Sequence, residues 1–173
     1  QEAPRWEFIA ARFLMLDFSE KLKVELAKRN IRSFYEKLTY LEEKGLYGAY
    51  IRAGYSKEEL EKAYSYIDTG KNDLFTYSGL DLLLRRYVIS TRGHIPLETP
   101  QEMFLGISLH LALHEKNDRM EWVRRFYLML SSLQVTMATP TLSNARKPYH
   151  QLSSCFIDTV PDSLDGIYRS IDN

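Results

Sequence analysis

The residues most suited to chemistry lie in the last part of the chain, where the single cysteine, Cys155, follows two serines. A cysteine thiolate is a nucleophile and can exchange into a disulfide. Upstream, residues 136–143 are mostly small and hydroxylated around Pro140, which predicts backbone turns whose hydroxyl and N–H groups can hold phosphate oxygens. Taken alone, a free cysteine is more often a small buried residue than a reactive thiol, so both interpretations stay open at this point.

The residues after Cys155 predict a strand and then a helix. Residues 156–160 form a short apolar and β-branched run, which is typical of a buried strand, and Pro161 ends it. Asp162 is then placed to cap a helix, with Asp165 three residues further on. A turn-rich loop, a cysteine that opens a strand and a helix start therefore fall within one supersecondary unit.

Three motifs follow one another closely in this part of the chain: ATPTLSNAR at 138–146, QLSSCF at 151–156 and PDSLD at 161–165. Together they resemble the large, catalytic subunit of ribonucleotide reductase. The upstream residues are similar to the helical region that precedes the catalytic barrel in that family. The residues of these motifs are more similar to class I, which reduces diphosphates with a radical supplied by a second subunit. The cobalamin-dependent class has similar TPTL and SSCF motifs.

The resemblance implies roles for three residues around a substrate. It makes Cys155 one of the two active-site thiols that reduce the ribose and become a redox-active disulfide, while the partner thiol and the thiyl-radical cysteine are not in this sequence. It also makes Thr139 and Ser154 contacts to the substrate, largely at its phosphate end. For the neighbouring Thr141 and Ser143, a turn hydroxyl that bonds its own backbone is an equal alternative.

The resemblance also implies an allosteric effector site at Asp162, Ser163 and Leu164, where ATP or a deoxynucleoside triphosphate would bind at the interface of a homodimer of the catalytic subunit. A helix N-terminus favours anions. The Asp162 carboxylate would repel phosphate, so we expect it to bind a sugar hydroxyl or a base edge. An ordinary helix cap is the structural alternative, and it is compatible with the effector role.

Cofactors and further partners are likewise implied by the resemblance. No cofactor is expected within this chain, because the radical would come from a metal-containing small subunit and the electrons from a thioredoxin or glutaredoxin-type reductant. Another polypeptide would carry the rest of the barrel, as in a split or excised protein. The chain alone is predicted to be inactive, because oxidising a dithiol needs a second sulfur and only Cys155 is present.

Composition argues against several classes of protein. The 173 residues carry 23 basic and 23 acidic side chains, so charge does not point to nucleic acid or a membrane surface. No apolar run approaches a membrane span, and the opening QEAPRWEF lacks a signal-peptide pattern. A lone cysteine fits a cytoplasmic protein. His110 and His114 have the helical spacing of metal ligands but no third ligand nearby, so no metal site is predicted.

The rest of the chain predicts helices. Ser56 and Glu59 form a capping box that begins one helix. Gly45 is expected to end the helix that precedes this one, and Asp118 is expected to cap the helix over 118–133. Apolar residues recur at helical spacing in five further segments: 6–28, 31–44, 74–86, 99–114 and 118–133.

The segment 74–86 is expected to turn Tyr77 and Leu80 inward, and residues 87–97 could form a small hairpin around Thr91. The sequence therefore predicts a mainly α fold in which residues 1–135 form a helical region. By the resemblance, residues 136–173 begin a ten-stranded α/β barrel with its substrate loop, first strand and effector-site helix.

Two other functions stay open. A cobalamin-dependent reductase fragment would share the motifs, and cobalamin dependence or a nearby radical-generating subunit would separate the two classes. A non-catalytic helical interaction module would reuse the fold without chemistry. A neighbouring reading frame with the remaining cysteines and strands would favour the enzyme, and its absence would favour the module.

Overall fold

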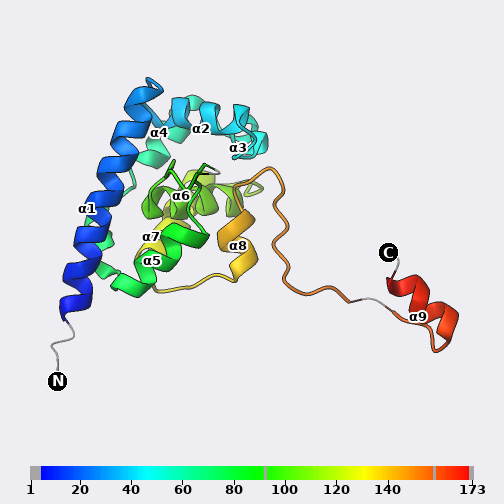
Figure 1. Cartoon of the computed structure of the whole chain (residues 1–173). Helices are drawn as coiled ribbons and strands as arrows, with labels where there is room; N and C mark the ends of the chain where they lie inside the picture. Colours follow the sequence, from blue (N-terminus) through cyan, green and yellow to red (C-terminus); the bar gives the residue numbers. More distant parts are fainter. Residues whose placement is uncertain (1–4, 92, 158, 172–173) are drawn as a thin grey trace.

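The computed structural model describes residues 5–91, 93–157 and 159–171, and within these residues the chain forms helices and no β-strand (Figure 1). The mainly α prediction is therefore confirmed for the described residues. In chain order the elements are α1 (Arg5–Lys28), α2 (Phe34–Glu43), α3 (Ala49–Gly54), α4 (Lys57–Tyr64), the 3-10 helix η1 (Thr69–Leu74), α5 (Tyr77–Arg86), α6 (Pro100–Leu111), α7 (Arg119–Ser131), α8 (Thr139–Asn144) and α9 (Leu164–Ile171).

Helix α6 forms the centre of the body, because most of its residues are apolar and its few polar side chains find partners in the body. Residues 100–109 are all buried, as expected for a helix without a polar face. Thr99 caps the helix and forms a capping box with Glu102, and Pro100 occupies the first turn, where its missing N–H costs nothing. The helix start that the sequence predicted at this position is confirmed.

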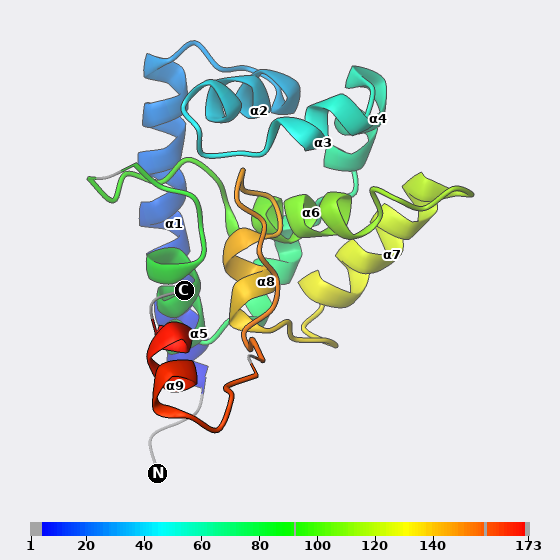
Figure 2. The same cartoon turned by 90° about the vertical axis from the view of Figure 1, so that its right-hand side faces the viewer.

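Other helices of the body surround α6, whereas α9 lies apart from the body (Figure 1). Helix α7 packs along α6, α8 lies against it, and the pairs α1–α5 and α2–α4 complete the body (Figures 1 and 2). One contact between layers is a buried ion pair, in which Lys37 Nζ of α2 lies 2.6 Å from Glu102 Oε1 of α6. The same carboxylate accepts from the N–H of Thr99, so Glu102 joins helix capping to tertiary packing.

Helix α1 buries a narrow stripe and leaves other apolar residues outside. Ala11, Phe18 and Leu22 are buried, and α1 packs against α5. Phe13, by contrast, is 69% exposed, and Leu16 is exposed as well. The helix predicted here is confirmed, but its amphipathic character is not, because its apolar residues do not gather on one buried face.

Several local predictions are confirmed. Ser56 caps α4 with Glu59. Gly45 takes a positive φ of 66° just after Lys44, the C-cap of α2, and its N–H bonds the carbonyl of Glu42. The expected hairpin is reduced to one antiparallel bridge between Ser90 and Pro96. Arg92, which belongs to the turn of the expected hairpin, lies outside the described residues.

Other local predictions are wrong. Tyr77 is 44% exposed rather than inward, because Thr76 caps α5 and the helix begins at Tyr77 instead of Leu74. Asp118 precedes α7 in a left-handed conformation and makes no side-chain cap. The turns expected over 136–143 are largely helix α8, because Pro140 fits a first helical turn and the Ala138 carbonyl begins the helical bonds. Helix α3 was not predicted.

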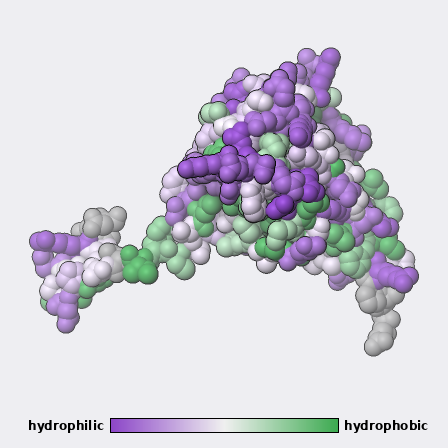
Figure 3. All heavy atoms as spheres, turned by 180° about the vertical axis from the view of Figure 1, so that it is seen from behind, coloured by the Kyte–Doolittle hydropathy of each residue, from purple (hydrophilic) through white to green (hydrophobic). Residues whose placement is uncertain are grey.

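The strand expected at 155–160 does not form in its described residues, and Asp158 lies outside them. The backbone there has no neighbouring strand to bond with, and a single strand is not stable in water. Ile157 is 99% exposed. The segment leads away from the body to α9, and Figure 3 shows apolar surface along it and along one edge of the body. The start of a barrel therefore stays an expectation.

Replacing Gly106 of α6 by alanine should destabilise the fold. A Cβ there would lie 2.4 Å from Tyr47 Oη and 2.7 Å from Arg146 Cδ, both in buried side chains. Overpacking of this kind costs about 1–3 kcal/mol, which outweighs the roughly 1 kcal/mol that alanine adds as a helix former. Urea unfolding measures the change. Gly93→Ala, whose Cβ would meet only Thr91 Oγ1 at 3.8 Å, is the control; equal stability of the two variants would contradict the packing argument.

Candidate functional site

Thr139 is the predicted substrate contact that the helical body holds in place. It begins α8 and is exposed, and its hydroxyl lies 3.2 Å from the hydroxyl of the buried Tyr87 at the end of α5. The contact fixes one side of the Thr139 hydroxyl and leaves the other open to solvent. Thr141, by comparison, is buried in the packing of α8 against α6.

Helix α8 is anchored by an arginine that is 0% exposed. Arg146 Nε lies 3.0 and 3.1 Å from the two carboxylate oxygens of Glu98, and Nη2 also bonds Glu98. The same guanidinium donates to the carbonyls of Leu142 at 2.9 Å and Tyr87 at 2.7 Å. Glu98 in turn accepts from the N–H of Ile89 at 2.8 Å. One ion pair thus joins α8, the end of α5, the loop at 89 and the start of α6.

Backbone groups beside Arg146 add further anchors. The N–H of Gly48 bonds the Arg146 carbonyl at 2.9 Å, and the Tyr50 hydroxyl donates to the Ala145 carbonyl at 2.6 Å. Tyr50 has one hydroxyl proton, so His110 Nδ1, 2.8 Å from the same oxygen, must carry the proton of that second bond. Burial lowers the pKa of His110, and the neighbouring His150 and His114 add to the effect.

The anchoring stops shortly before the cysteine. Asn144 Nδ2 donates to the carbonyl of Gln151 at 2.9 Å, and Leu152 packs partly against the core. Residues 153–157 are exposed. Cys155 is a free, exposed thiol 3.8 Å from Ser154 Oγ. The structure therefore brings Ser154 and Cys155 together, while Thr139 is fixed separately on the body.

The predicted effector residues lie together at the start of α9, and one assignment among them is wrong. Ser163, not Asp162, caps this helix, since its hydroxyl accepts from the N–H of Gly166 at 3.1 Å. Helix α9 begins at Leu164, so Asp162 lies one residue too early to cap it. Asp162 is exposed and makes no hydrogen bond or ion pair with the residues that the structure describes. Its carboxylate is thus available to a ligand.

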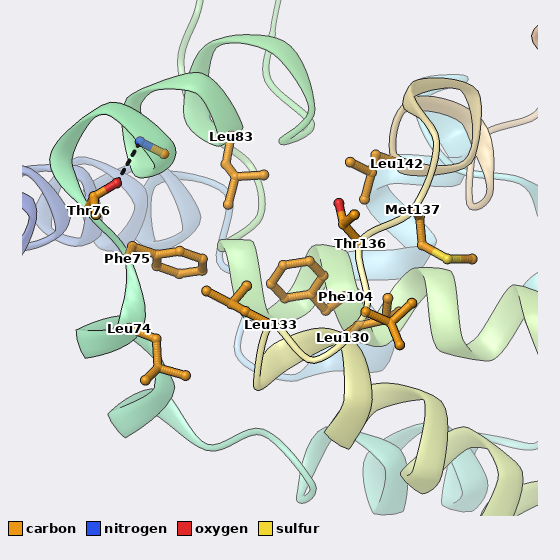
Figure 4. A pocket seen from close by; sticks show the side chains of 12 residues that line it. Leu74, Phe75, Thr76, Leu83, Phe104, Leu130, Leu133, Thr136, Met137 and Leu142 are labelled. Atoms are coloured by element: carbon orange, nitrogen blue, oxygen red, sulfur yellow. Dashed lines mark hydrogen bonds between the residues drawn. The ribbon is translucent and has the colours of Figure 1, made fainter.

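An apolar pocket of about 310 Å³ lies beneath the segment that leads into α8 (Figure 4). Phe75 and Phe104 form its floor, and Met137 and Leu142 close the side toward α8. Among the described residues no group of three His, Cys, Asp or Glu side chains is placed to hold a metal. No helix in the described part of the chain is long and apolar enough to cross a membrane.

Comparison with known proteins identifies the family. Residues 73–150 match the model of the ribonucleotide reductase all-alpha domain. The whole chain is 72% identical over 173 residues to the ribonucleoside-diphosphate reductase subunit alpha of Treponema pallidum (strain Nichols), covering 100% of this chain and 20% of that relative. The chain belongs to the ribonucleotide reductase alpha-subunit family. The resemblance expected from the three motifs is confirmed.

More distant reductase alpha subunits are similar over nearly the same span. The chain is 34% identical over 169 residues to the one of Helicobacter pylori (strain ATCC 700392 / 26695), covering 98% of this chain and 21% of the relative. It is 26% identical over 170 residues to the ribonucleoside-diphosphate reductase 1 subunit alpha of Escherichia coli (strain K12), covering 96% and 22%. The chain spans about a fifth of the length of these relatives.

The residues that hold this part of the reductase together were not found from the sequence. Arg146 ends the ATPTLSNAR motif, yet neither it nor Glu98 was assigned a role. A signal existed, since Glu98 is a lone carboxylate in the apolar run IPLET directly before a helix cap. Such a carboxylate predicts a buried partner. The partner is 48 residues away, so only the tertiary structure shows which residue it is.

Breaking the Arg146–Glu98 pair should cost far more than breaking an exposed pair. Glu98→Gln leaves a buried guanidinium without a counter-charge, for which we expect a loss of about 3–5 kcal/mol in the free energy of unfolding. Arg146→Met should cost a similar amount, and the double variant Glu98→Leu/Arg146→Met less than the sum. Asp81→Asn, which breaks the exposed pair of Asp81 with Arg85, should cost at most about 1 kcal/mol. Additive losses in urea unfolding would show that the two residues act independently.

Proposed function

We propose that this chain is the N-terminal part of a ribonucleoside-diphosphate reductase catalytic subunit, which converts ribonucleotides to 2′-deoxyribonucleotides. Identity of 72% to a reductase alpha subunit over the whole chain is the observation that carries the proposal. The free, exposed Cys155 supports it, because this chemistry needs a thiol that substrate and reductant can reach.

The proposed reaction replaces the 2′-hydroxyl of the ribose by hydrogen. Two thiols are oxidised to a disulfide, and the hydroxyl leaves as water, so the two electrons and two protons of the dithiol balance the reduction. A thiyl radical on a third cysteine starts and ends the cycle. Cys155 is proposed as one of the reducing thiols, and the other two sulfurs would belong to the rest of the subunit, because this chain has a single cysteine.

Substrate binding is proposed for Thr139 and Ser154, through hydroxyl donors to the phosphate end of the nucleotide. Thr139 suits this role because its hydroxyl is exposed and positioned by Tyr87. Ser154 would reach the same substrate once residues 153–160 pair with the remaining barrel strands. Pairing would also cover Phe156 and Ile157, whose side chains are exposed in this chain.

Effector binding is proposed at the start of α9. Asp162 offers a carboxylate with no partner among the described residues, suited to a sugar hydroxyl or a base edge, and Ser163 and the N–H of Leu164 lie beside it. The effector would be ATP or a deoxynucleoside triphosphate, bound between two copies of the catalytic subunit. Ser163 already caps α9, so its hydroxyl proton is free to donate to such a ligand.

The partners of the proposed enzyme follow from its chemistry. We propose class I, with a radical from a metal-containing small subunit and electrons from a thioredoxin or glutaredoxin-type protein in the cytoplasm. The relatives are named ribonucleoside-diphosphate reductases, which supports class I over the cobalamin-dependent class. The rest of the catalytic subunit would complete the site. A helical interaction module without catalysis is the remaining alternative.

Mixing experiments test the proposed function. The 173-residue chain alone should form no deoxynucleotide. Mixed with the rest of the catalytic subunit, the small subunit, substrate and a thioredoxin system, it should restore product formation. Cys155→Ser in that mixture should reduce turnover to background while assembly persists, since a serine hydroxyl cannot supply the thiol chemistry.

Two controls make the result specific. Ser153→Ala, two residues from the cysteine, should keep most of the activity. Gel filtration of each variant with the remaining polypeptide shows whether assembly is preserved. Product from the isolated chain, or turnover by Cys155→Ser at the level of the unmodified chain, would overturn the proposal. Assembly without turnover in every mixture would favour the interaction module.

Replacing Asp162 by alanine in the completed enzyme should change effector response more than basal reduction. Loss of a charge-assisted hydrogen bond should weaken effector binding by about 1–3 kcal/mol and alter which effector favours which substrate. The measurement is substrate preference titrated against each nucleotide. Asp165→Ala, in the first turn of α9, is the matched control. Unchanged effector affinities would leave Asp162 without a binding role.

A further inference from the structure

A polar cavity of about 330 Å³ lies on the helical body, away from Thr139 and Cys155. Its walls are formed by the turn after α2, the C-terminus of α5, residues 88–91, His94 and Lys147. Arg85, Arg86 and Lys147 bring three cations to it, and none of the described residues that line it is a carboxylate. In a chain with 23 basic and 23 acidic residues, this is a local excess of positive charge.

Two of the three cations have no partner in the described part of the chain. Arg85 bonds Asp81 at 2.7 Å, but the side chains of Arg86 and Lys147 make no ion pair or hydrogen bond with described residues. The nearby carboxylate, Glu98, is already held by Arg146 through both of its oxygens. The cavity therefore keeps unpaired donors that the surrounding fold does not neutralise.

Neither arginine side chain of α5 caps the Leu83 or the Tyr87 carbonyl. Basic residues often end a helix because they stabilise its last carbonyls, and Arg85 and Arg86 lie in the last turn of α5. Here the Leu83 carbonyl accepts from the N–H groups of Tyr87 and Val88, and the Tyr87 carbonyl accepts from Arg146. These carbonyls have their donors without either arginine side chain.

Lys147 is the partly buried member of the group. Burial lowers its pKa, the neighbouring Arg146 lowers it further, and Glu98 acts in the opposite direction. A partly buried ammonium without a counter-ion is unfavourable. An anion in the cavity would supply the missing charge.

Hydroxyl groups complete the donor set. Thr91 Oγ1 accepts from the N–H of Ile95 at 3.2 Å, so its own proton is free to donate into the cavity. Ser90 Oγ has no partner among the described residues. Leu46 and Val88 add apolar surface beside these donors.

We propose that this cavity binds a small phosphate-bearing molecule, no larger than a mononucleotide. The side chains of Arg86 and Lys147 and the hydroxyl donors, with no carboxylate among the described lining residues, suit a tetrahedral oxyanion, and the apolar wall suits the group that carries the phosphate. The volume is at the small end of ligand pockets. The cavity lies beyond the C-terminus of α8, whereas Thr139 is at its N-terminus, so the proposal does not depend on the proposed reductase function.

Binding to the 173-residue chain tests the proposal. Inorganic phosphate, pyrophosphate, AMP and ADP are titrated in separate calorimetric arms at constant ionic strength, which distinguishes a free phosphate ligand from a nucleotide. At least one should bind saturably with a stoichiometry of one. Arg86→Gln/Lys147→Gln should weaken this binding tenfold or more, and amide NMR signals of Ser90, Thr91 and Lys147 should shift in the unmodified chain only.

Lys23→Gln/Lys116→Gln is the matched control, because it removes the same charge from two exposed lysines elsewhere. Its affinity should stay within twofold of the unmodified chain. Equal weakening in both double variants would mean a general charge effect and would overturn the proposal, as would the absence of saturable binding in every arm. Circular dichroism checks that each variant folds. If the variant with Lys147→Gln does not fold, the binding affinity of Arg86→Gln alone tests the proposal, because the Arg86 side chain is exposed.

Discussion

A buried guanidinium must find acceptors on every side, and Arg146 finds them in distant parts of the chain. Glu98 supplies the charge, while the carbonyls of Tyr87 and Leu142 take the remaining donors. Leaving any of these groups unpaired in the interior costs more than the pair gains. The end of α5, the start of α6 and the end of α8 must therefore be in place together, which turns a six-residue helix into a fixed platform for Thr139.

The segment after Leu152 lacks any such constraint, and the difference explains its conformation. Phe156 and Ile157 are exposed, and the described residues around them have no backbone partner. A β-branched run has the side chains of a strand, but hydrogen bonds from a neighbouring strand decide whether it forms one. Under the proposed function, that neighbour belongs to the other four fifths of the subunit, and Cys155 acquires its surroundings only when the strand is paired.

The sequence predicted best those features that depend on a few adjacent residues. The caps at Ser56 and Thr99 and the helix end at Gly45 are confirmed because side chain, backbone and turn lie within one helical turn. Tyr77 and Asp162 were misplaced because the caps at Thr76 and Ser163, not the predicted positions, set where α5 and α9 begin. Arg146 and Glu98 were missed for a different reason, since a pair that is 48 residues apart leaves no local pattern.

The same ion pair holds α8 between two proposed phosphate-binding sites. At its N-terminus, Thr139 offers one hydroxyl that Tyr87 orients toward solvent. Beyond its C-terminus, burial and the neighbouring Arg146 both lower the pKa of Lys147, and Glu98 acts in the opposite direction. Neutralising Lys147 with an anion would remove a repulsion next to the anchor without touching the Tyr87–Thr139 contact. Because α8 is held at Arg146 rather than at Thr139, an occupied cavity would stabilise the platform as a whole and leave the geometry of the Thr139 hydroxyl unchanged.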